Sequence, residues 1–455
     1  MSHSPIAELL RFTMRKTLSV ALLVAFSQAA TAGSLVLDLR AQAQIRDAWL
    51  ERRTTVVLPE LMRRADIDLW VIAGREYNED PVLKTFLPAT WLSARRRTVL
   101  LIHDPGADQP LETLAVARYD VGRIFRQSWD PEAEPDQWRR TAVLIAERNP
   151  ERIGINTSAD FALADGLTHS EHQAFTRALG PELSRRLTSA QSLAVGWLET
   201  RTAEEMIVYR QICAIAHEII REGFSRKAIQ PGVTTTEDLV WWFRERVRAR
   251  GLIDWFHPSV SVQRAEVDST DHRSEVLRRT RDSGPIQPGD LLHVDFGITY
   301  LGLNTDTQQH AYVLREGENT APQDLADALK VGNRLQDILT GEFTNGRTGN
   351  QILRAALEQA AKEDIVASIY THPIGYHGHA AGPAIGMWDQ QQGVPGSGDY
   401  PLYPNTAYSI ELYAERPIAG WNRSVRIKLE EDAFFDGTSV RYIDGRQTEL
   451  LLIGN

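Results

Sequence analysis

The sequence predicts an α/β domain followed by a second domain that also contains helices and strands. The chain has 455 residues, more than one hydrophobic core usually supports, so two domains are expected. Between residues 68 and 156, short apolar segments typical of strands alternate with helical segments rich in Arg and Glu, which is the pattern of an α/β domain. Near residue 197 the pattern changes to long amphipathic helices. We therefore place the first domain at residues 33–196 and the second at residues 197–455.

The composition limits the classes of function. Hydrophobic residues make up 42% of the chain, which is typical of a soluble globular protein. The formal net charge of −10 argues against nucleic-acid binding, because the excess of acidic residues opposes the formation of a basic surface patch. Cys213 is the only cysteine, so the chain has neither an intrachain disulfide nor a Cys-based metal site.

The N-terminus has the pattern of a secretory signal. Arg15 and Lys16 precede an apolar segment at residues 18–26, and small residues follow at positions 30–32. This pattern predicts a signal peptide at residues 1–32, with an apolar core too short to span a bilayer. A buried N-terminal helix is the alternative. We expect the mature protein to be exported, periplasmic or secreted, without a membrane segment after cleavage.

The first domain gives no indication of a chemistry. Its predicted strands lie at residues 68–73, 98–103, 113–118 and 152–156. The segments between them contain no glycine-rich loop of the kind that binds phosphate. We therefore look for the functional site in the second domain.

The second domain begins with two predicted helices. Thr202 is expected to cap the first, whose opening turn holds Glu204 and Glu205 and so suits the helix dipole. Residues 234–237, Thr-Thr-Thr-Glu, form a capping-box pattern that opens the second helix, which is expected to end near Gly251.

Acidic residues then occur inside apolar, strand-like segments, where acids are normally depleted. They are Asp295, Asp306, Glu411 and either Glu430 or Glu431, and a His-rich segment lies at residues 372–379. The two Asp residues lie near glycines and can also be interpreted as turn residues. Four carboxylates in one partly buried site would be very unfavourable unless cations neutralised them. We therefore predict two divalent ions (Mn, Co, Zn or Fe) and metal-assisted hydrolysis.

These motifs resemble, in order, those of the pita-bread metallopeptidases, which include methionine aminopeptidase, aminopeptidase P and prolidase. Asp295 and Asp306 have the family's spacing of eleven. Residues 378–382, Gly-His-Ala-Ala-Gly, are similar to its Gly-His-x-x-Gly ligand loop, and residues 409–411 to its first Glu strand. Residues 430–432 resemble its final acidic segment, in which the first Glu binds metal. The resemblance covers about residues 197–445 and favours the creatinase/prolidase branch.

The resemblance implies a fold, a ligand set and a mechanism. The fold would be an α/β N-terminal domain followed by an α+β pita-bread (creatinase/aminopeptidase-like) domain. Asp295 would bind one metal ion, Asp306 and Glu430 would bridge both ions, and His379 and Glu411 would complete the second. Manganese is the preferred metal. A bridging hydroxide would attack the substrate carbonyl, and Glu411 would help to move the proton.

The remaining histidines are less clearly assigned. His377 is interpreted as a catalytic or substrate-contacting residue, with a loop histidine bound to the backbone as the alternative. The choice between His377 and His379 as the ligand stays open. His372, which precedes a proline, is expected to be structural. Either His257 or His272 would be the upstream histidine that contacts substrate in the family.

Three positions depart from the family pattern. The family places a second His seven residues after the ligand His, but position 386 is Gly. The Arg that usually follows the second Asp by three residues is Gln309, and the Arg two residues before the last Glu is Lys428, with Arg426 two further back. These differences leave the metal ligands in place but affect the residues expected to recognise a peptide.

Three functions are compatible with these residues. The first is an exported, homodimeric Xaa-Pro aminopeptidase or dipeptidase that cleaves peptides beside proline. The second is a hydrolase or lyase of the same fold acting on a small non-peptide substrate, such as a creatinase-like C–N hydrolase. The third is a binding module without catalytic activity, which would be expected to lack some of the ligands.

Overall fold

The computed structural model describes residues 36–106, 109–265 and 284–454. Residues Leu39–Asn455 form one compact unit. The predicted signal peptide at residues 1–32 and the candidate His272 lie outside the described residues. Within the described ranges, none of the helices is both long enough and apolar enough to cross a membrane.

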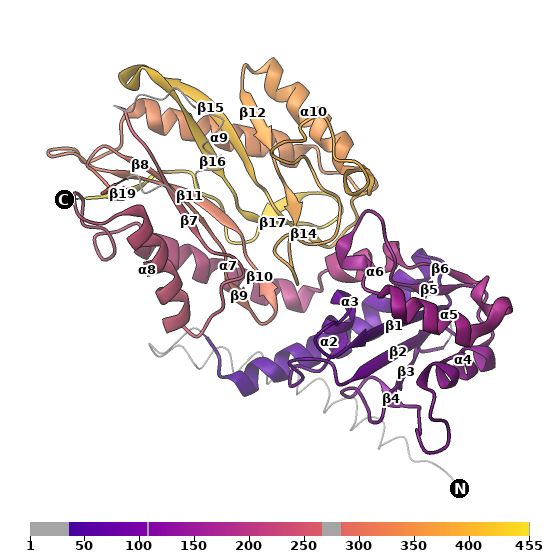
Figure 1. Ribbon diagram of the computed structural model, residues 1–455. Helices are drawn as coiled ribbons and strands as arrows, with labels where there is room; N and C mark the ends of the chain where they lie inside the picture. The colour runs from indigo at the N-terminus through magenta and orange to yellow at the C-terminus, as the bar shows by residue number, and fades with distance from the viewer. Residues whose placement is uncertain (1–35, 107–108, 266–283, 455) are drawn as a thin grey trace, which may run out of the picture. The chain divides into compact units, whose positions relative to one another are not determined.

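A mixed six-stranded sheet forms the core of the N-terminal domain (Figure 1). Its strand order is β4-β3-β2-β1-β5-β6. The strands are β1 (Leu69–Arg75), β2 (Arg97–His103), β3 (Glu112–Val116), β4 (Arg126–Gln127), β5 (Ile153–Ile155) and β6 (Leu187–Ser189). The four strands expected from the sequence are therefore confirmed, and the two short edge strands β4 and β6 are additional.

Helices cover both faces of this sheet. They are α2 (Leu39–Arg64), α3 (Pro81–Phe86), α4 (Gln137–Arg148), α5 (His169–Ser184) and α6 (Gln191–Glu199). Alternate residues of β1 serve different cores: Trp70 and Ile72 pack with α2, α3 and α6, whereas Leu69 and Val71 pack with α4 and α5. A strand with apolar side chains on both faces is expected to be covered on both sides, as in α/β folds.

The C-terminal domain begins with α7 (Ala203–Gly223) and α8 (Thr236–Ala249). Both start with the capping boxes that their sequences suggest: Thr202 accepts from the backbone N–H of Glu205, and Thr235 accepts from that of Asp238. Two further helices, α9 (Gln323–Gly341) and α10 (Gly349–Lys362), precede the last strands.

The strands of this domain form three main sheets and a small hairpin. The first sheet, in the order β19-β11-β8-β7, joins β7 (Ser259–Gln263), β8 (Leu291–Phe296), β11 (Thr307–Val313) and β19 (Leu451–Ile453). The hairpin of β9 (Thr299–Tyr300) and β10 (Leu303–Asn304) connects β8 to β11. The second sheet contains β12 (Val366–Ile369), β15 (Leu412–Ile418) and β16 (Arg423–Leu429). The third contains β13 (His372–Pro373), β14 (Thr406–Ser409), β17 (Asp432–Phe435) and β18 (Val440–Tyr442).

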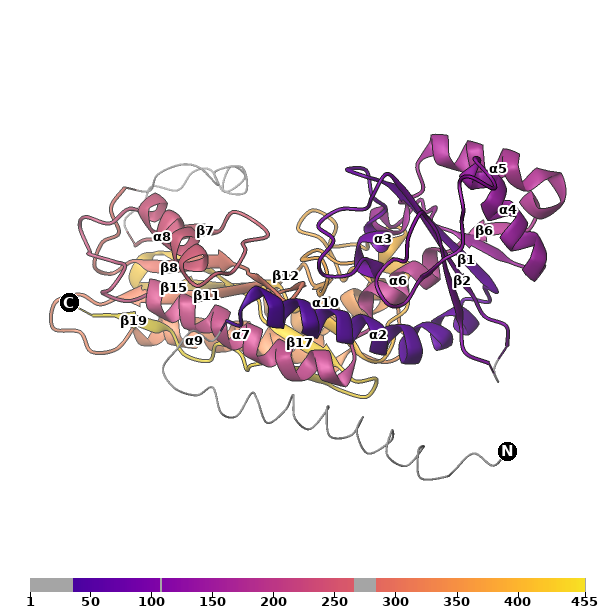
Figure 2. The same cartoon turned by 90° about the horizontal axis from the view of Figure 1, so that it is seen from below.

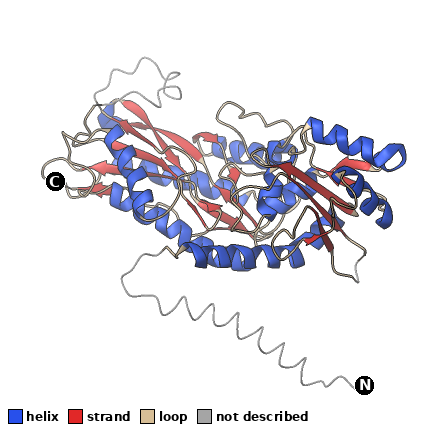
Figure 3. Ribbon diagram, turned by 60° about the horizontal axis from the view of Figure 1, so that its bottom comes forward, coloured by secondary structure: helices blue, strands red, loops and turns tan. Residues whose placement is uncertain are grey.

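Helices lie against two of these sheets (Figures 2 and 3). Helix α8 contacts β7, and α7 contacts both β8 and β11. Helix α9 contacts β15 and β16, and α10 contacts β12. The structure therefore has the α/β N-terminal domain and the α+β C-terminal domain that the sequence predicts.

Two adjacent chain segments pass from the third sheet to the second at the same level. Ser409 pairs with Asp432 in one sheet, and Leu412 pairs with Leu429 in the other. Between these pairs lie only residues 410–411 on one segment and 430–431 on the other. Each segment was expected to be a single strand, but each is broken at this point. Local breaks in pairing redirect side chains, and here they occur at three acidic residues.

Candidate metal centre

The two aspartates lie at the end of the β8–β11 pair that is next to the β9–β10 hairpin. Asp295 is on β8, whereas Asp306 lies one residue before β11. The residue directly opposite Asp295 across the ladder is Gln308, so the two Asp residues are not cross-strand partners. They nevertheless come together: ligand atoms of Asp295, Asp306 and Glu430 all lie within 4.8 Å of one another.

Glu411 and Glu430 come from the two broken segments. Glu430 is buried, and its Oε1 accepts a 2.6 Å hydrogen bond from the hydroxyl of Ser409. One amide nitrogen, Nε2 of Gln308, donates to both carboxylates, at 2.6 Å to Glu430 and 2.8 Å to Glu411. The structure therefore brings together the four acidic side chains that were predicted as ligands.

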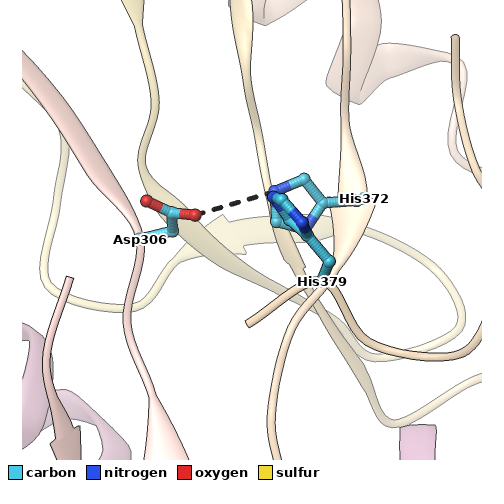
Figure 4. A group of neighbouring side chains, drawn as sticks. All are labelled: Asp306, His372 and His379. Carbon is cyan, nitrogen blue, oxygen red and sulfur yellow. Dashed lines mark ion pairs between the residues drawn. The ribbon is translucent and has the colours of Figure 1, made fainter. Parts of the chain in front are cut away.

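His372, on β13, faces the carboxylate of Asp306 (Figure 4). Its Nε2 lies 3.4 Å from Oε1 of Glu430 and 3.8 Å from Oδ2 of Asp306. It belongs to two of the three groups of potential metal ligands among the described residues, one with Asp306 and His379 and one with Glu411 and Glu430. A structural role is expected for His372 from the sequence, and its position among the potential metal ligands was not predicted.

His379 lies near the same group but is exposed, in the loop after β13. Its ring packs edge-on against Trp255, with centroids 5.5 Å apart, and it also contacts His372 at 4.7 Å. Because Trp255 also packs closely on Gly378, where a Cβ atom would come within 2.3 Å of the indole, the loop has little freedom at this point. His379 thus lies on the more open side of the cluster.

His377 is not in any of the three groups of potential ligands found among the described residues. Burial, followed by the charges of Lys84 and Arg201, lowers the pKa of His377 to about 4, so the ring is neutral at physiological pH. Its buried Nδ1 has no hydrogen-bond partner. The catalytic role expected for His377 stays a prediction.

Position 386 accounts for one departure from the family pattern. Gly386 has φ +78, and a Cβ atom there would lie 2.2 Å from the carbonyl oxygen of Ile369. No side chain fits at this position, so the seven-residue spacing cannot run from His379 to residue 386. The same spacing does run from His372 to His379.

Three other residues named in the sequence analysis, Gln309, Arg426 and His257, have defined partners. The amide of Gln309 donates a 2.9 Å hydrogen bond to Glu431, and Arg426 forms an ion pair with Glu415 at 3.3 Å. The upstream candidate His257 contacts Arg244, at 3.1 Å between nitrogens, and its ring packs against Trp241.

Electrostatics support a cation site. Burial raises the pKa of Asp306 well above its ordinary value, and the charges of Glu430, Asp295, Glu411 and Asp432 raise it further. Two buried atoms of the cluster residues, Oδ1 of Asp306 and Nε2 of His372, have no hydrogen-bond partner. Buried polar atoms normally have partners, and several carboxylates this close together call for positive charge. The donor set of carboxylate oxygens and one imidazole therefore fits divalent metal ions.

One neighbouring acid, Asp432, contacts the cluster from the side of α7. Asp432 accepts the backbone N–H of Asp306 at 3.3 Å and the thiol of Cys213 at 3.4 Å. The sequence motifs included Ser409 and Asp432 without giving either a role, and they did not include Gln308. Their positions two residues from predicted ligands, on strands where alternate side chains share a face, were the available signal for Gln308 and Ser409.

Together, the fold and the cluster define the class of pita-bread metallopeptidases. Residues 208–432 match the model of metallopeptidase family M24. No curated protein is similar enough to the chain to count as a match. Among solved structures, the chain is similar to an X-Pro aminopeptidase from Thermotoga maritima MSB8, with 16% identity and a TM-score of 0.59 over 86% of this chain and 99% of that one.

Two further solved structures agree with this fold. The Xaa-Pro dipeptidase from Bacillus anthracis is 16% identical, with a TM-score of 0.55 over 90% of this chain and 99% of that one. The prolidase from Pyrococcus horikoshii OT3 is 12% identical, with a TM-score of 0.53 over 90% of this chain and 100% of that one. The C-terminal domain therefore belongs to metallopeptidase family M24, which implies a divalent metal ion, and it follows an N-terminal domain of the kind found in these structures.

Proposed function

We propose that this protein is a peptidase that uses two divalent metal ions to cleave a peptide bond next to proline, as an aminopeptidase or a dipeptidase. The observation that carries the proposal is the convergence of Asp295, Asp306, Glu411 and Glu430 with one buried imidazole. The proline preference is supported by the fold shared with the X-Pro aminopeptidase, the Xaa-Pro dipeptidase and the prolidase.

In this proposal Asp295, Asp306 and Glu430 would hold one ion, and Glu411 and Glu430 would hold the other together with a histidine. We assign His372 rather than His379 to the second ion. His372 is buried and its Nε2 faces Glu430 and Asp306, whereas His379 is exposed. His379, seven residues further on, then takes the place of the substrate-contacting histidine expected from the family pattern.

Divalent ions bound there would polarise the substrate carbonyl and make a water molecule a nucleophile near neutral pH. The protein's own groups perform the remaining tasks. Glu411 would accept a proton from the attacking water and return it to the nitrogen of the leaving amine, and the Gln308 amide at 2.8 Å fixes the orientation of the Glu411 carboxylate. His379, which lies beside Trp255 and Tyr370 on the exposed side of the cluster, contacts the substrate.

The test compares metal content with peptide turnover. We expect the purified protein to bind divalent ions and, with Mn²⁺ added, to hydrolyse Xaa-Pro peptides faster than the matching Xaa-Ala peptides. Asp306→Ala is expected to abolish turnover while the protein stays folded. Turnover of neither peptide set by a metal-loaded protein would favour the small-molecule alternative, and the absence of any bound or activating metal would favour a binding module.

Two further properties are proposed from the sequence. We expect export, because residues 1–32 combine two basic residues, an apolar segment and a small-residue cleavage site. Cell fractionation with N-terminal sequencing of the mature protein tests this. We also expect a homodimer, and light scattering on the purified protein tests that.

A further inference from the structure

Behind the metal centre, a buried imidazole lies between two carboxylates that the proposed mechanism does not use. Nε2 of His217 lies 2.7 Å from Oε2 of Glu431, and its Nδ1 lies 3.0 Å from Oδ2 of Asp444. His217 is on α7, one helical turn after Cys213, whose thiol contacts Asp432. One face of α7 therefore contacts two consecutive acids, Glu431 and Asp432, at the start of β17.

Glu431 connects this imidazole to the rest of the centre. It is 1% exposed, and its Oε1 accepts 2.9 Å hydrogen bonds from the side-chain amide of Gln309 and from the backbone N–H of Gln447. These two donors are neutral, whereas His217 can supply a positive charge. Burial lowers the pKa of His217, but the hydrogen bond and charge of Glu431, followed by those of Asp444, outweigh burial and raise it to about 9. The ring is therefore a cation at neutral pH.

Glu431 is the next residue after Glu430, and the two side chains make contacts on opposite sides of the chain. Glu430 contacts Gln308, Ser409 and His372, whereas Glu431 contacts Gln309 and His217. The backbone between them is held by hydrogen bonds of Glu430 with Gln308, at 2.9 and 3.2 Å. Fixing the side chain of Glu431 therefore restricts the peptide unit that aims Glu430 at the metal position.

We infer that His217 is a positioning residue of the metal centre, which acts by clamping Glu431 against Asp444 and so fixes the orientation of Glu430. This inference rests on the proposed metal centre but not on the identity of the substrate. It requires that removing the imidazolium weakens metal binding without a change in any metal ligand, since residues that orient ligands commonly affect metal affinity about 10- to 100-fold.

The experiment measures metal binding directly, by calorimetric titration of the metal-free full-length chain with Mn²⁺. We expect His217→Gln to weaken the binding of at least one ion by about 10- to 100-fold. His217→Lys, which keeps a cation at this position, is expected to recover part of the affinity. The visible absorption spectrum of the Co²⁺-loaded His217→Gln variant should also change, because the position of Glu430 affects the geometry around the ion. His169→Gln, at an exposed position on α5, serves as the matched control and should behave as the wild type.

Unchanged Mn²⁺ affinity and an unchanged Co²⁺ spectrum in His217→Gln would overturn the inference. Two results together would also overturn it. In the first, His217→Gln loses both its affinity for Mn²⁺ and the cooperative unfolding of its metal-free form. In the second, Asp444→Asn, which removes only the second carboxylate, binds Mn²⁺ as the wild type does. Weaker Mn²⁺ binding by an Asp444→Asn variant that still unfolds cooperatively would support the inference that His217 clamps Glu431 against Asp444. A wild type that binds Mn²⁺ but cleaves no peptide would contradict the proposed function alone, whereas a wild type that binds no divalent ion would overturn both.

Discussion

The side-chain amide of Gln308 donates a 2.6 Å hydrogen bond to Oε2 of Glu430. The same nitrogen donates to Glu411, and the amide oxygen lies 2.9 Å from Nε2 of His293. Burial, followed by the charges of Lys428 and His310, lowers the pKa of His293 well below its ordinary value, so this ring is neutral. A neutral imidazole that donates from Nε2 to the amide oxygen fixes which end of Gln308 faces the carboxylates.

Gln308→Met is expected to destabilise the metal-free protein. The substitution leaves the carboxylates of Glu430 and Glu411 without this donor, and the loss of hydrogen bonds to buried charged groups typically costs about 1–3 kcal/mol. Added Mn²⁺ should reduce the difference from wild type, because cations then neutralise the same oxygens. Urea denaturation with a chelator and with Mn²⁺ measures both effects. Gln392→Met, at an exposed position, is the control, and equal stability of the metal-free Gln308→Met and wild-type proteins would contradict the role given to the amide.

Substitution of the two histidines of the cluster is expected to have different effects, one on metal binding and the other on substrate binding. His372→Gln should lose one metal ion per chain, because it removes the imidazole that faces Glu430 at 3.4 Å. His379→Gln should keep its metal but hydrolyse peptides poorly, with the loss mainly in kcat/KM. Metal analysis after dialysis, together with steady-state kinetics, distinguishes them. If His379→Gln loses the ion and His372→Gln keeps it, the ligand expected from the local Gly-His-x-x-Gly motif is the correct one.

Local motifs predicted much of the fold and the acidic part of the site. The apolar segments around residues 68–73 and 98–103 became central strands because both of their faces are buried. The spacing of Asp295 and Asp306 placed both acids in one cluster. Such features depend on neighbours in the sequence, so they can be recognised in a single chain.

Other features depend on residues far apart in the chain and could not be predicted. Residues 372 and 379 are both histidines next to glycine or proline, and only the position of β13 beside β14 makes His372 the buried one. From the sequence, Glu411 and Glu430 are each predicted to lie within a continuous strand. A short apolar segment does not show where the chain passes from one sheet to another. Similarly, the clamp on Glu431 joins residues more than 200 positions apart.

Asp306→Asn is expected to separate stability from function. The substitution keeps the shape of a side chain that is 4% exposed but removes one negative charge from a crowded group. We expect the metal-free variant to be at least as stable as the wild type and to gain up to about 1 kcal/mol, the usual size of a single-residue effect. Peptide turnover should be lost, because one of the carboxylates proposed to hold the metal ions is missing. Thermal unfolding of both metal-free proteins tests this, and a marked destabilisation of the variant would show that the Asp306 carboxylate is stabilised by contacts other than a cation.

Glu199, at the end of α6, provides a prediction about pH. The side chain is 2% exposed; its Oε1 accepts from the hydroxyl of Tyr400 at 3.2 Å, and its buried Oε2 has no hydrogen-bond partner. Burial raises the pKa of this carboxyl from 4.5 to about 8, although the charge of Arg64 and the Tyr400 hydrogen bond oppose the shift. The folded protein therefore keeps a proton that the unfolded chain has already lost over this range of pH.

A raised pKa in the folded state means that stability is fully present below pH 4.5 and falls as the pH rises through about 8. The slope can reach about 1.4 kcal/mol per pH unit for one group. Glu199→Gln cannot ionise, so the variant should match the wild type near pH 4.5 and exceed its free energy of unfolding at pH 8. Urea denaturation of the metal-free proteins between these values measures the two slopes, with Glu358→Gln as an exposed control. His217 contributes its own decline toward pH 9 in both proteins, so the difference between them isolates Glu199. Parallel curves for Glu199→Gln and wild type would mean that Glu199 is ionised in the folded protein at neutral pH, with Arg64 as its effective partner.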